Sequence, residues 1–299
     1  SVPVFAFLGA VATLAAVAVL PSLGWLTLFD RDEGYYVECA REMLERGDWF
    51  VPHFSGEPWM EKPPLAYWLM AASMKLLGTT EFAARLPGAL CGIAAVWLVW
   101  RLGRRMYGLR AGALAALAAA TSVFFMAILR LALVDMALLC ATMISMVGLW
   151  RLTQGEGLRG PVLFHLGCGL GVLAKGPLGL ALPVIALGGY VLWTRRWRTL
   201  WDARPFLGAA IVGAVVCLWA VPATLQTRGE FLRELVWVRT IKPMFDPLQG
   251  HGGSGLWQRL ALVPVYVPIL LAGLLPWTAF LWPAVRRAWA ERRASSRTA

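Results

Sequence analysis

Charged residues are scarce in this sequence of 299 residues. Asp, Glu, Lys and Arg make up 15% of it, and hydrophobic residues make up 59%. A soluble domain typically contains about 25% charged residues. The shortage excludes an ordinary soluble domain, and we expect an all-α polytopic membrane protein that crosses the lipid bilayer many times.

Cysteine is scarce outside the apolar parts of the chain. Four of the five cysteines lie in apolar runs, where they are typical of small core residues, and Cys39 lies alone in the main polar segment. We therefore expect no disulfide. The sequence also lacks the spacing of His and Cys that indicates a zinc site.

Long apolar runs are abundant, and each predicts a membrane span because a spanning helix needs about 20 mostly apolar residues. We expect about eight spans, at Val4–Leu26, Leu86–Leu102, Ala111–Leu129, Val134–Leu152, Phe164–Ala174, Leu178–Trp193, Phe206–Ala223 and Leu260–Val285. The fifth and sixth runs are short and are separated by Lys175-Gly176-Pro177. One long re-entrant element at this place is the alternative, and it would invert the topology of all later segments.

The arginines predict the orientation of these spans, because short Arg-rich loops stay in the cytoplasm. In the eight-span topology they cluster in alternate loops, namely at residues 101–110, 151–159, 195–204 and 286–297. The net charge of +11 is therefore mainly a topology signal, and no nucleic-acid partner is expected. We expect one transmembrane module over residues 1–299, with outer loops at 30–82 and 225–258 and a disordered basic cytoplasmic tail at 286–299.

The longest polar segment runs from Asp30 to Pro64 and holds nine of the 17 acidic residues. Asp30 and Glu33 have the spacing of a capping box, and Asp32 could equally cap the helix that follows. Apolar residues at helical spacing predict an amphipathic interfacial helix over 33–46, with Gly47 as its stop. A second apolar helix is expected over 65–77, after two prolines.

Charged residues in the outer segments indicate a site for a lipid-linked phosphate. Lys62 directly precedes a helix N-terminus, where an anion is favoured. Further cations in the outer segments are Arg130, Lys175 and Arg239. A phosphate leaves readily without a general acid, whereas an acceptor hydroxyl needs a base such as Asp32. These parts predict glycosyl transfer by a single inverting displacement.

Several motifs carry a family resemblance. They are Asp32-Glu33, the run from Ala40 to Trp49, Glu61-Lys62-Pro63-Pro64-Leu65, Arg130-x4-Asp135, Ala174-Lys175-Gly176-Pro177 and Leu274-Leu275-Pro276-Trp277. In this order they resemble the bacterial GT-C glycosyltransferases, among them the aminoarabinose transferases that act on lipid A and the protein O-mannosyltransferase-like (glycosyltransferase 39) family. The resemblance covers nearly the whole chain.

The resemblance implies a GT-C-type helix bundle in the bacterial inner membrane with a site that faces the periplasm. It implies an undecaprenyl-phosphate sugar donor and an acceptor such as lipid A, another glycolipid, a glycan or a protein. By motif position Asp32 is the catalytic base, and Asp135 is a second acidic residue of the site. The substrate-binding residues that we expect are Glu33, Tyr36, Trp59, Glu61, Lys62, Arg130, Lys175, Arg239 and His251.

No cofactor is required by these parts, although Glu33 or Asp135 could hold a divalent cation such as Mg²⁺ or Mn²⁺. The chain also departs from the aminoarabinose transferases, which commonly have Arg-Tyr where this sequence has Tyr35-Tyr36. One phosphate-binding cation is thereby lost. Those enzymes continue into further spans and a soluble C-terminal domain after the region of resemblance.

Other interpretations of these residues stay open at this point. A transporter or flippase of a lipid-linked sugar, or a non-catalytic assembly subunit, would also have many spans and outer charges, but neither would need Asp32. Asp32 could be a helix cap alone, and Lys62 could extend its amine to the membrane interface. Asp135 could pair with Arg130, and Lys175 and His251 could be ordinary turn and loop residues.

Overall fold

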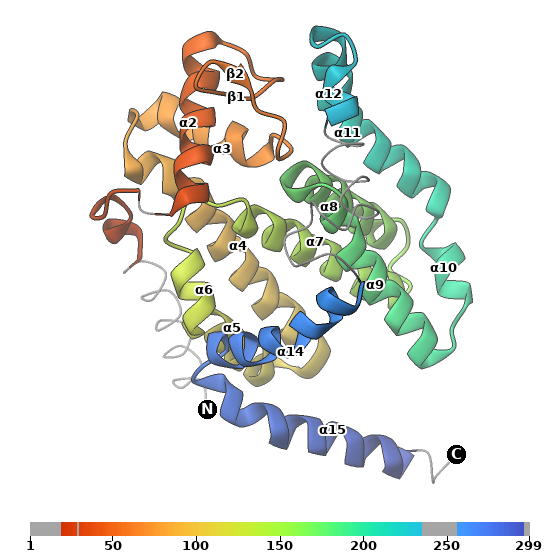
Figure 1. Ribbon diagram of the computed structural model, residues 1–299. Coiled ribbons are helices and arrows are strands. Elements are labelled where there is room, and N and C mark those ends of the chain that lie inside the picture. Colours follow the sequence, from red (N-terminus) through yellow and green to blue (C-terminus); the bar gives the residue numbers. More distant parts are fainter. Residues whose placement is uncertain (1–18, 29, 235–255, 296–299) are drawn as a thin grey trace.

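The computed structural model describes residues 19–28, 30–234 and 256–295, and the chain is mainly helical there (Figure 1). The first elements are η1 (Leu20–Gly24), α2 (Arg31–Arg46), β1 (His53–Phe54), β2 (Glu57–Pro58), α3 (Leu65–Leu77), α4 (Glu81–Tyr107), α5 (Leu109–Thr121) and α6 (Val123–Ile128). Those that follow are α7 (Asp135–Thr153), α8 (Arg159–Lys175), α9 (Pro177–Thr194), α10 (Arg198–Asp202), α11 (Pro205–Gln226), α12 (Glu230–Leu232), α14 (Leu256–Gly273), η3 (Trp277–Phe280) and α15 (Leu281–Ser295). The all-α membrane class is confirmed, and the antiparallel β1–β2 hairpin is the only sheet in these ranges.

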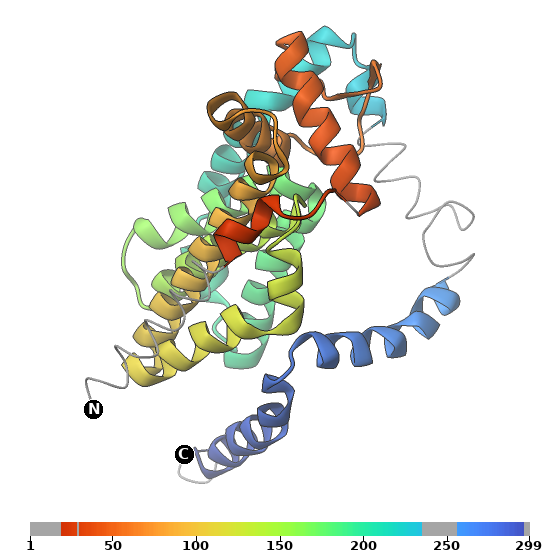
Figure 2. The ribbon, with the colours of Figure 1, turned by 90° about the vertical axis from the view of Figure 1, so that its left-hand side faces the viewer.

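A polar cap covers one end of the helix bundle. Figures 1 and 2 show α2, the hairpin and α3 at this end, and α15 at the opposite end. The end of α11 joins the cap, because the Trp219 indole donates a 2.8 Å hydrogen bond to the carbonyl of Phe50. Trp219 and Phe231 of α12 pack there against Val51. The cap therefore gathers segments that lie almost 200 residues apart in the sequence.

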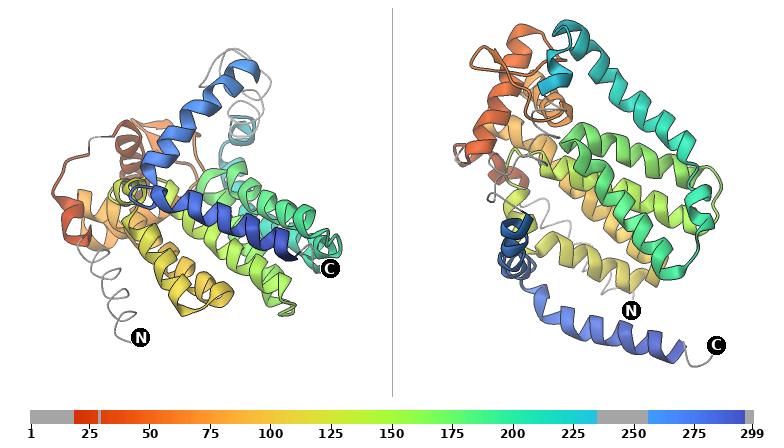
Figure 3. Two further views of the ribbon diagram at one scale, coloured as in Figure 1. Left: turned by 90° about the horizontal axis from the view of Figure 1, so that it is seen from below. Right: turned by 45° about the vertical axis from the view of Figure 1, so that its right-hand side comes forward.

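Small residues let the bundle helices approach each other closely, as is common between membrane helices. Helices α7, α8 and α9 lie side by side, in shades of green in Figure 3. A Cβ at Gly148 of α7 would lie 2.2 Å from the nitrogen of Phe164 in α8. One at Gly179 of α9 would lie 1.9 Å from the carbonyl carbon of Gly171 in α8. The fifth and sixth runs are thus two helices packed against each other, as expected, with the break at Gly176.

The number of long apolar helices is smaller than the eight expected spans. In the described ranges four helices are long and apolar enough to cross a membrane: α4, α7, α9 and α11. Helix α8, with 17 residues, is not among them. The expected span at residues 111–129 is divided, because Ser122 is extended and separates α5 from α6. Most of the first expected span lies outside the described residues.

The C-terminal part corrects two further expectations. The run at residues 260–285 is not one straight helix: its two helical parts are bent by 106° relative to each other. Pro276, which lacks a backbone N–H, lies at this break. Counted as one broken span, the pair raises the number of spans to five. The tail expected to be disordered instead continues as helix α15 to Ser295, because its Ala and Arg residues are strong helix formers.

The arginine-rich turns meet at the end of the bundle opposite the cap. Arg105 at the end of α4 and Arg151 of α7 both contact Glu156, at 3.6 and 3.5 Å. The turns after α4 and after α7 therefore lie on the same side, as the arginine pattern predicts. The acidic polar segment and these basic turns occupy opposite ends of the molecule (Figure 1).

A buried arginine joins the cap to the bundle. Arg85, near the start of α4, is 2% exposed, and Glu33 of α2 is fully buried. The guanidinium donates to both carboxylate oxygens of Glu33, at 2.7 and 3.1 Å. Its remaining donors reach the carbonyls of Leu23, Leu26 and Thr27. All five N–H donors of the guanidinium are thus satisfied.

The same carboxylate also fixes the loop before α7. Glu33 Oε1 accepts a 2.9 Å hydrogen bond from the backbone N–H of Ala132. The Arg85–Glu33 pair therefore holds together four segments: the chain before α2, the start of α2, the start of α4 and the loop that leads to Asp135. Asp32 and Asp135 each lie within three residues of an anchored position, so their separation depends on this pair.

We predict that Arg85→Ala lowers the free energy of unfolding by about 3 to 5 kcal/mol, because it leaves the Glu33 carboxylate buried without a counter-charge. The measurement is the thermal unfolding midpoint of the purified protein in detergent. Arg31→Ala is the control, since Arg31 is exposed. Equal midpoints for the two variants would show that the buried pair does not hold the cap.

Candidate active site

Asp30, and not Asp32, caps helix α2. Its carboxylate accepts hydrogen bonds from the backbone N–H groups of Asp32 and Glu33, at 2.9 and 3.3 Å. Only half of the expected capping box forms, because the Glu33 side chain turns to Arg85 instead of back to Asp30. The exposed Asp32 side chain has no capping role. Within the described ranges its carboxylate makes no hydrogen bond or ion pair, and it lies at the positive end of the helix dipole.

Glu33 does not lie where we expected it. It is fully buried, and both of its oxygens are used by Arg85 and Ala132. A substrate or a cation could reach this carboxylate only by breaking the buried pair. Glu33 is therefore a scaffold residue, and Asp135 alone remains of the two suggested metal ligands. No cluster of three or more His, Cys, Asp or Glu suited to a metal ion occurs in the described part of the chain.

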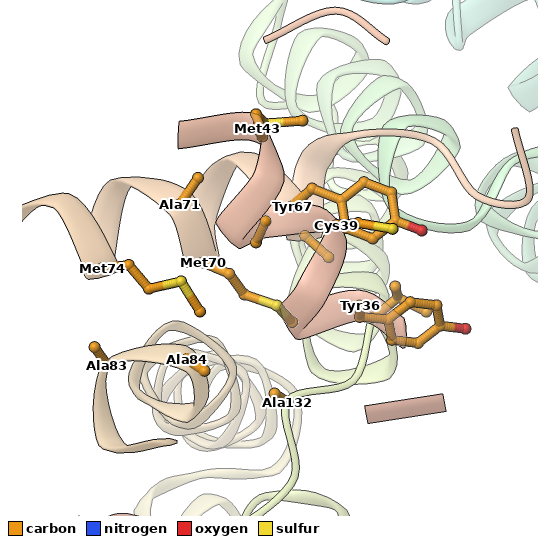
Figure 4. Close-up of a cluster of buried hydrophobic side chains, with 13 residues drawn as sticks. Tyr36, Cys39, Met43, Tyr67, Met70, Ala71, Met74, Ala83, Ala84 and Ala132 are labelled. Atoms are coloured by element: carbon orange, nitrogen blue, oxygen red, sulfur yellow. The ribbon is translucent and has the colours of Figure 1, made fainter. Parts of the chain in front are cut away.

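Tyr36 is influenced by the carboxylates of Asp32, Glu61 and Asp135, and we call this group of residues the acidic site. Its side chain is 4% exposed and packs beside Tyr67, with ring centroids 5.9 Å apart (Figure 4). Burial raises the pKa of Tyr36, and the carboxylates of Asp32, Glu61 and Asp135 raise it further. The phenol therefore stays neutral and can donate a hydrogen bond at physiological pH. Carboxylates from three different segments thus act on this one hydroxyl.

The turn before α3 carries an ion pair. Lys62 Nζ lies 3.2 Å from Glu61 Oε1, and both side chains remain partly exposed. Pro63 and Pro64 are buried, and α3 begins at Leu65, as predicted from the sequence. The prolines have no N–H to give to a helix and fix the turn ahead of it. The lysine is thereby held at the mouth of the acidic site beside its carboxylate.

Asp135 pairs with a different cation from the one considered in the sequence. Its carboxylate accepts a 2.7 Å hydrogen bond from Lys175 Nζ, at the end of α8. Arg130 is exposed, and within the described ranges no ion pair joins it to Asp135. The reason is that the anchored Ala132 and buried Val134 hold the intervening loop against the bundle. Asp135 at the start of α7 thus faces the end of α8.

The two lysine turns adjoin each other. A Cβ built on Gly176, next to Lys175, would lie 3.9 Å from Pro63 Cγ, next to Lys62. Helix α3 also contacts α8. Two lysine–carboxylate pairs, Lys62–Glu61 and Lys175–Asp135, therefore belong to the same site. Asp32 belongs to the same site, because its carboxylate raises the pKa of Tyr36 together with the carboxylates of Glu61 and Asp135.

Aromatic side chains form a wall beside α2. The Trp59 ring stacks on Tyr35 at 5.2 Å, and Phe54 meets the Tyr35 ring edge-on at 4.8 Å. The hairpin that carries Phe54 is held by the buried Glu42, whose carboxylate accepts from the N–H of Gly56. Trp59 thus lies near the site, as expected. Arg31 donates a 3.3 Å hydrogen bond to the Tyr35 hydroxyl, which brings a guanidinium to this wall.

The structure therefore brings together seven of the predicted residues: Asp32, Tyr36, Trp59, Glu61, Lys62, Asp135 and, through its pair with Asp135, Lys175. Arg239 and His251 lie outside the described residues, so their predicted roles remain predictions. Sequence analysis missed Arg85 and Tyr67. Arg85 could have been found as a lone charge at the start of an apolar run, since such a residue needs a partner. Nothing in the sequence distinguishes Tyr67 from the apolar residues of its helix as a candidate site residue.

This arrangement combines a free carboxylate with two lysines at one end of a helical membrane bundle. The carboxylate can accept a proton, and the lysines can bind an anion if they exchange their present partners for it. The fold is that of a GT-C-type membrane helix bundle with a charged site at one end.

Residues 61–221 match the family model described as dolichyl-phosphate-mannose-protein mannosyltransferase. The chain belongs to this family. It is 35% identical over 94% of its length to the undecaprenyl phosphate-alpha-4-amino-4-deoxy-L-arabinose arabinosyl transferase of Edwardsiella ictaluri, of which it covers 50%. A similarly named transferase of Sodalis glossinidius is 32% identical over 97% of this chain, and 52% of that protein is covered.

Two solved structures resemble the fold of this chain over most of its length. The crystal structure of ArnT from Cupriavidus metallidurans bound to undecaprenyl phosphate matches with a TM-score of 0.82 and 25% identity, over 94% of this chain and 51% of that one. The apo structure of the same protein matches with a TM-score of 0.80. The chain spans about half the length of these relatives.

We predict that Asp30→Ala lowers the free energy of unfolding by about 0.5 to 2 kcal/mol, because it removes the α2 cap. Asp32→Asn should leave it unchanged, since the Asp32 side chain caps nothing. Thermal unfolding midpoints of the two variants and the wild type in detergent test this. The capping assignment is wrong if Asp32→Asn is the more damaging change.

Proposed function

We propose that this chain carries the active site of a glycosyltransferase that moves a sugar from a polyprenyl phosphate to an acceptor at the membrane surface. The observation that carries the proposal is the free carboxylate of Asp32 beside two lysine–carboxylate pairs. The named relatives use an undecaprenyl-phosphate donor, which supports the same donor class for this chain. The site lies at the end of the bundle, where a lipid-linked sugar can reach it without leaving the bilayer.

The reaction is a single displacement at the anomeric carbon. The acceptor hydroxyl loses its proton to the Asp32 carboxylate as its oxygen attacks this carbon. The bond between the carbon and the phosphate oxygen breaks, and the lipid phosphate leaves with the electron pair. Attack from the side opposite to the leaving group inverts the configuration of the sugar. A phosphate is already a stable anion, so the leaving group needs charge stabilisation and no proton.

Lys62 and Lys175 provide this stabilisation. In the free protein each lysine contacts a carboxylate, Glu61 or Asp135. An arriving phosphate replaces these carboxylates as the partner of the ammonium groups. Hydrogen bonds between charged groups contribute about 1.5 to 3 kcal/mol each, so two of them suffice to hold the lipid phosphate and stabilise its growing charge. The released Glu61 and Asp135 then face the sugar.

The acceptor is a glycolipid such as lipid A, another glycan or a protein on the periplasmic side of the bacterial inner membrane. The basic turns at the opposite end of the bundle favour this orientation. Where the aminoarabinose transferases commonly have arginine, Tyr35 holds the neighbouring Arg31 by a hydrogen bond. Arg31 offers a replacement cation at the mouth of the site.

The transporter alternative has less support. A transporter typically binds its substrate near the membrane midplane, between broken helices. Here the ionisable groups of the site lie in the cap and at the adjoining helix ends, and the carboxylate of Asp32 is free for chemistry. We therefore retain transfer as the proposed function.

The test is sugar transfer in membranes from undecaprenyl phosphate that carries 4-amino-4-deoxy-L-arabinose or mannose. Asp32→Asn should slow the release of undecaprenyl phosphate about 100-fold or more, because it removes the base. Asp202→Asn is the matched control, since Asp202 is an exposed helical aspartate in the α10 segment at the arginine-rich end. It should behave as the wild type.

Transfer at the wild-type rate by Asp32→Asn would contradict this role of Asp32. If Asp135→Asn then lost transfer while its unfolding midpoint stayed unchanged, Asp135 would be the base instead.

A further inference from the structure

Tyr67 of α3 has a buried hydroxyl without a partner. Its side chain is fully buried, and its hydroxyl makes no hydrogen bond with any described residue. An unpaired buried polar group typically costs about as much as a lost hydrogen bond, so native proteins rarely keep one without a use. Phenylalanine would fill the same space without this cost. The hydroxyl therefore needs an explanation.

A second unpaired donor lies beside it. The indole N–H of Trp59 is also buried and also lacks a partner among the described residues. It is close enough to Tyr67 to lower the pKa of the phenol, although burial dominates and the pKa of Tyr67 is raised in total. The two groups nevertheless do not meet hydrogen-bond geometry. Neither group therefore has a well-formed hydrogen bond among the described residues.

The phenol of Tyr67 points to the same side as the phenol of Tyr36. Figure 4 shows the rings of Tyr67 and Tyr36 projecting to the same side, with their oxygens directed away from Met70 and Met74. The carboxylate of Glu61 acts on both phenols. The Tyr67 ring thus lies beside the Tyr36 ring, with centroids 5.9 Å apart, and Glu61 acts on both hydroxyls.

We propose that Tyr67 Oη and Trp59 Nε1 form a subsite that binds a hydroxyl oxygen of the donor sugar. This inference rests on the proposed function and names the part of the site that holds the sugar. The indole N–H can only donate, whereas the phenol can donate and accept, so one sugar hydroxyl satisfies both groups. The subsite therefore recognises the sugar and not its lipid carrier.

The surrounding charges exclude the phosphate from this place. Tyr36, beside Tyr67, is surrounded by the carboxylates of Asp32, Glu61 and Asp135, which repel an anion. The two lysines that attract a phosphate lie at the adjoining turns. A neutral sugar hydroxyl suits the subsite, because it can accept from Trp59 or Tyr67 and donate to a carboxylate.

The experiment compares the binding of two classes of probe by calorimetry in detergent. One is bare undecaprenyl phosphate, and the other is the same lipid phosphate linked to 4-amino-4-deoxy-L-arabinose or to mannose. Tyr67→Phe should weaken the binding of a sugar-linked lipid about 3- to 10-fold, the effect of one neutral hydrogen bond. It should leave the affinity for the bare lipid unchanged. Trp59→Phe should act in the same direction.

Stability separates this role from a structural one. Because Tyr67→Phe removes an unpaired hydroxyl, its thermal unfolding midpoint should be equal to that of the wild type or higher. Ser73→Ala is the matched control, since Ser73 lies on the same helix and its hydroxyl is also buried without a partner. It should change neither probe's affinity.

Three outcomes would overturn the subsite. In the first, Tyr67→Phe keeps the wild-type preference for the sugar-linked lipid over the bare lipid. In the second, it lowers the unfolding midpoint and weakens both probes equally, which makes the hydroxyl structural. In the third, the wild type binds bare and sugar-linked lipid equally but still transfers sugar in membranes, which overturns the subsite and leaves the proposed function standing. Absence of transfer in membranes is the separate result that contradicts the proposed function.

Discussion

The ion pair of Arg85 and Glu33 is the interaction on which the rest of this structure depends. A guanidinium and a carboxylate are costly to bury, and they stay buried here because every N–H of the guanidinium has an acceptor. The pair joins the polar cap to the membrane bundle at a point where apolar packing alone would permit sliding. It also places Asp32, next to Glu33, in a fixed relation to the loop that ends at Asp135.

The site that results is built from charges that balance one another. Two lysines are neutralised by Glu61 and Asp135, while no cation among the described residues forms an ion pair with the carboxylate of Asp32. In the free protein both lysines are therefore paired. A lipid phosphate can bind by replacing the carboxylates as the partner of the lysines. The buried side chains of Tyr36 and Tyr67 pack beside each other, and the carboxylate of Glu61 acts on both phenols. In the proposed reaction, binding and chemistry therefore occupy adjacent parts of one acidic site.

Much of the fold could be predicted from local sequence patterns, because helical periodicity and turn residues depend on residues that are close together in the sequence. Helix α3 has the predicted bounds, and α2 ends at Gly47 as expected. The breaks at Ser122 and Pro276 were missed, since both lie inside runs that are apolar throughout. Site residues within the motifs were found, but their partners were not. Glu33 and its partner Arg85 lie 52 residues apart in the sequence. Asp135 pairs with Lys175 and not with the nearby Arg130, because long-range packing determines which charged groups come into contact.

A structure of the protein with undecaprenyl phosphate bound would test the central claim most directly, namely that the paired lysines form the phosphate site. The account predicts a phosphate oxygen within hydrogen-bond distance of Lys62 Nζ, with the contact between Lys62 and Glu61 opened. Helices α2 and α4 should keep their relative position, because the Arg85–Glu33 pair remains closed. A phosphate bound away from both Lys62 and Lys175, with the two lysine–carboxylate pairs intact, would contradict the account.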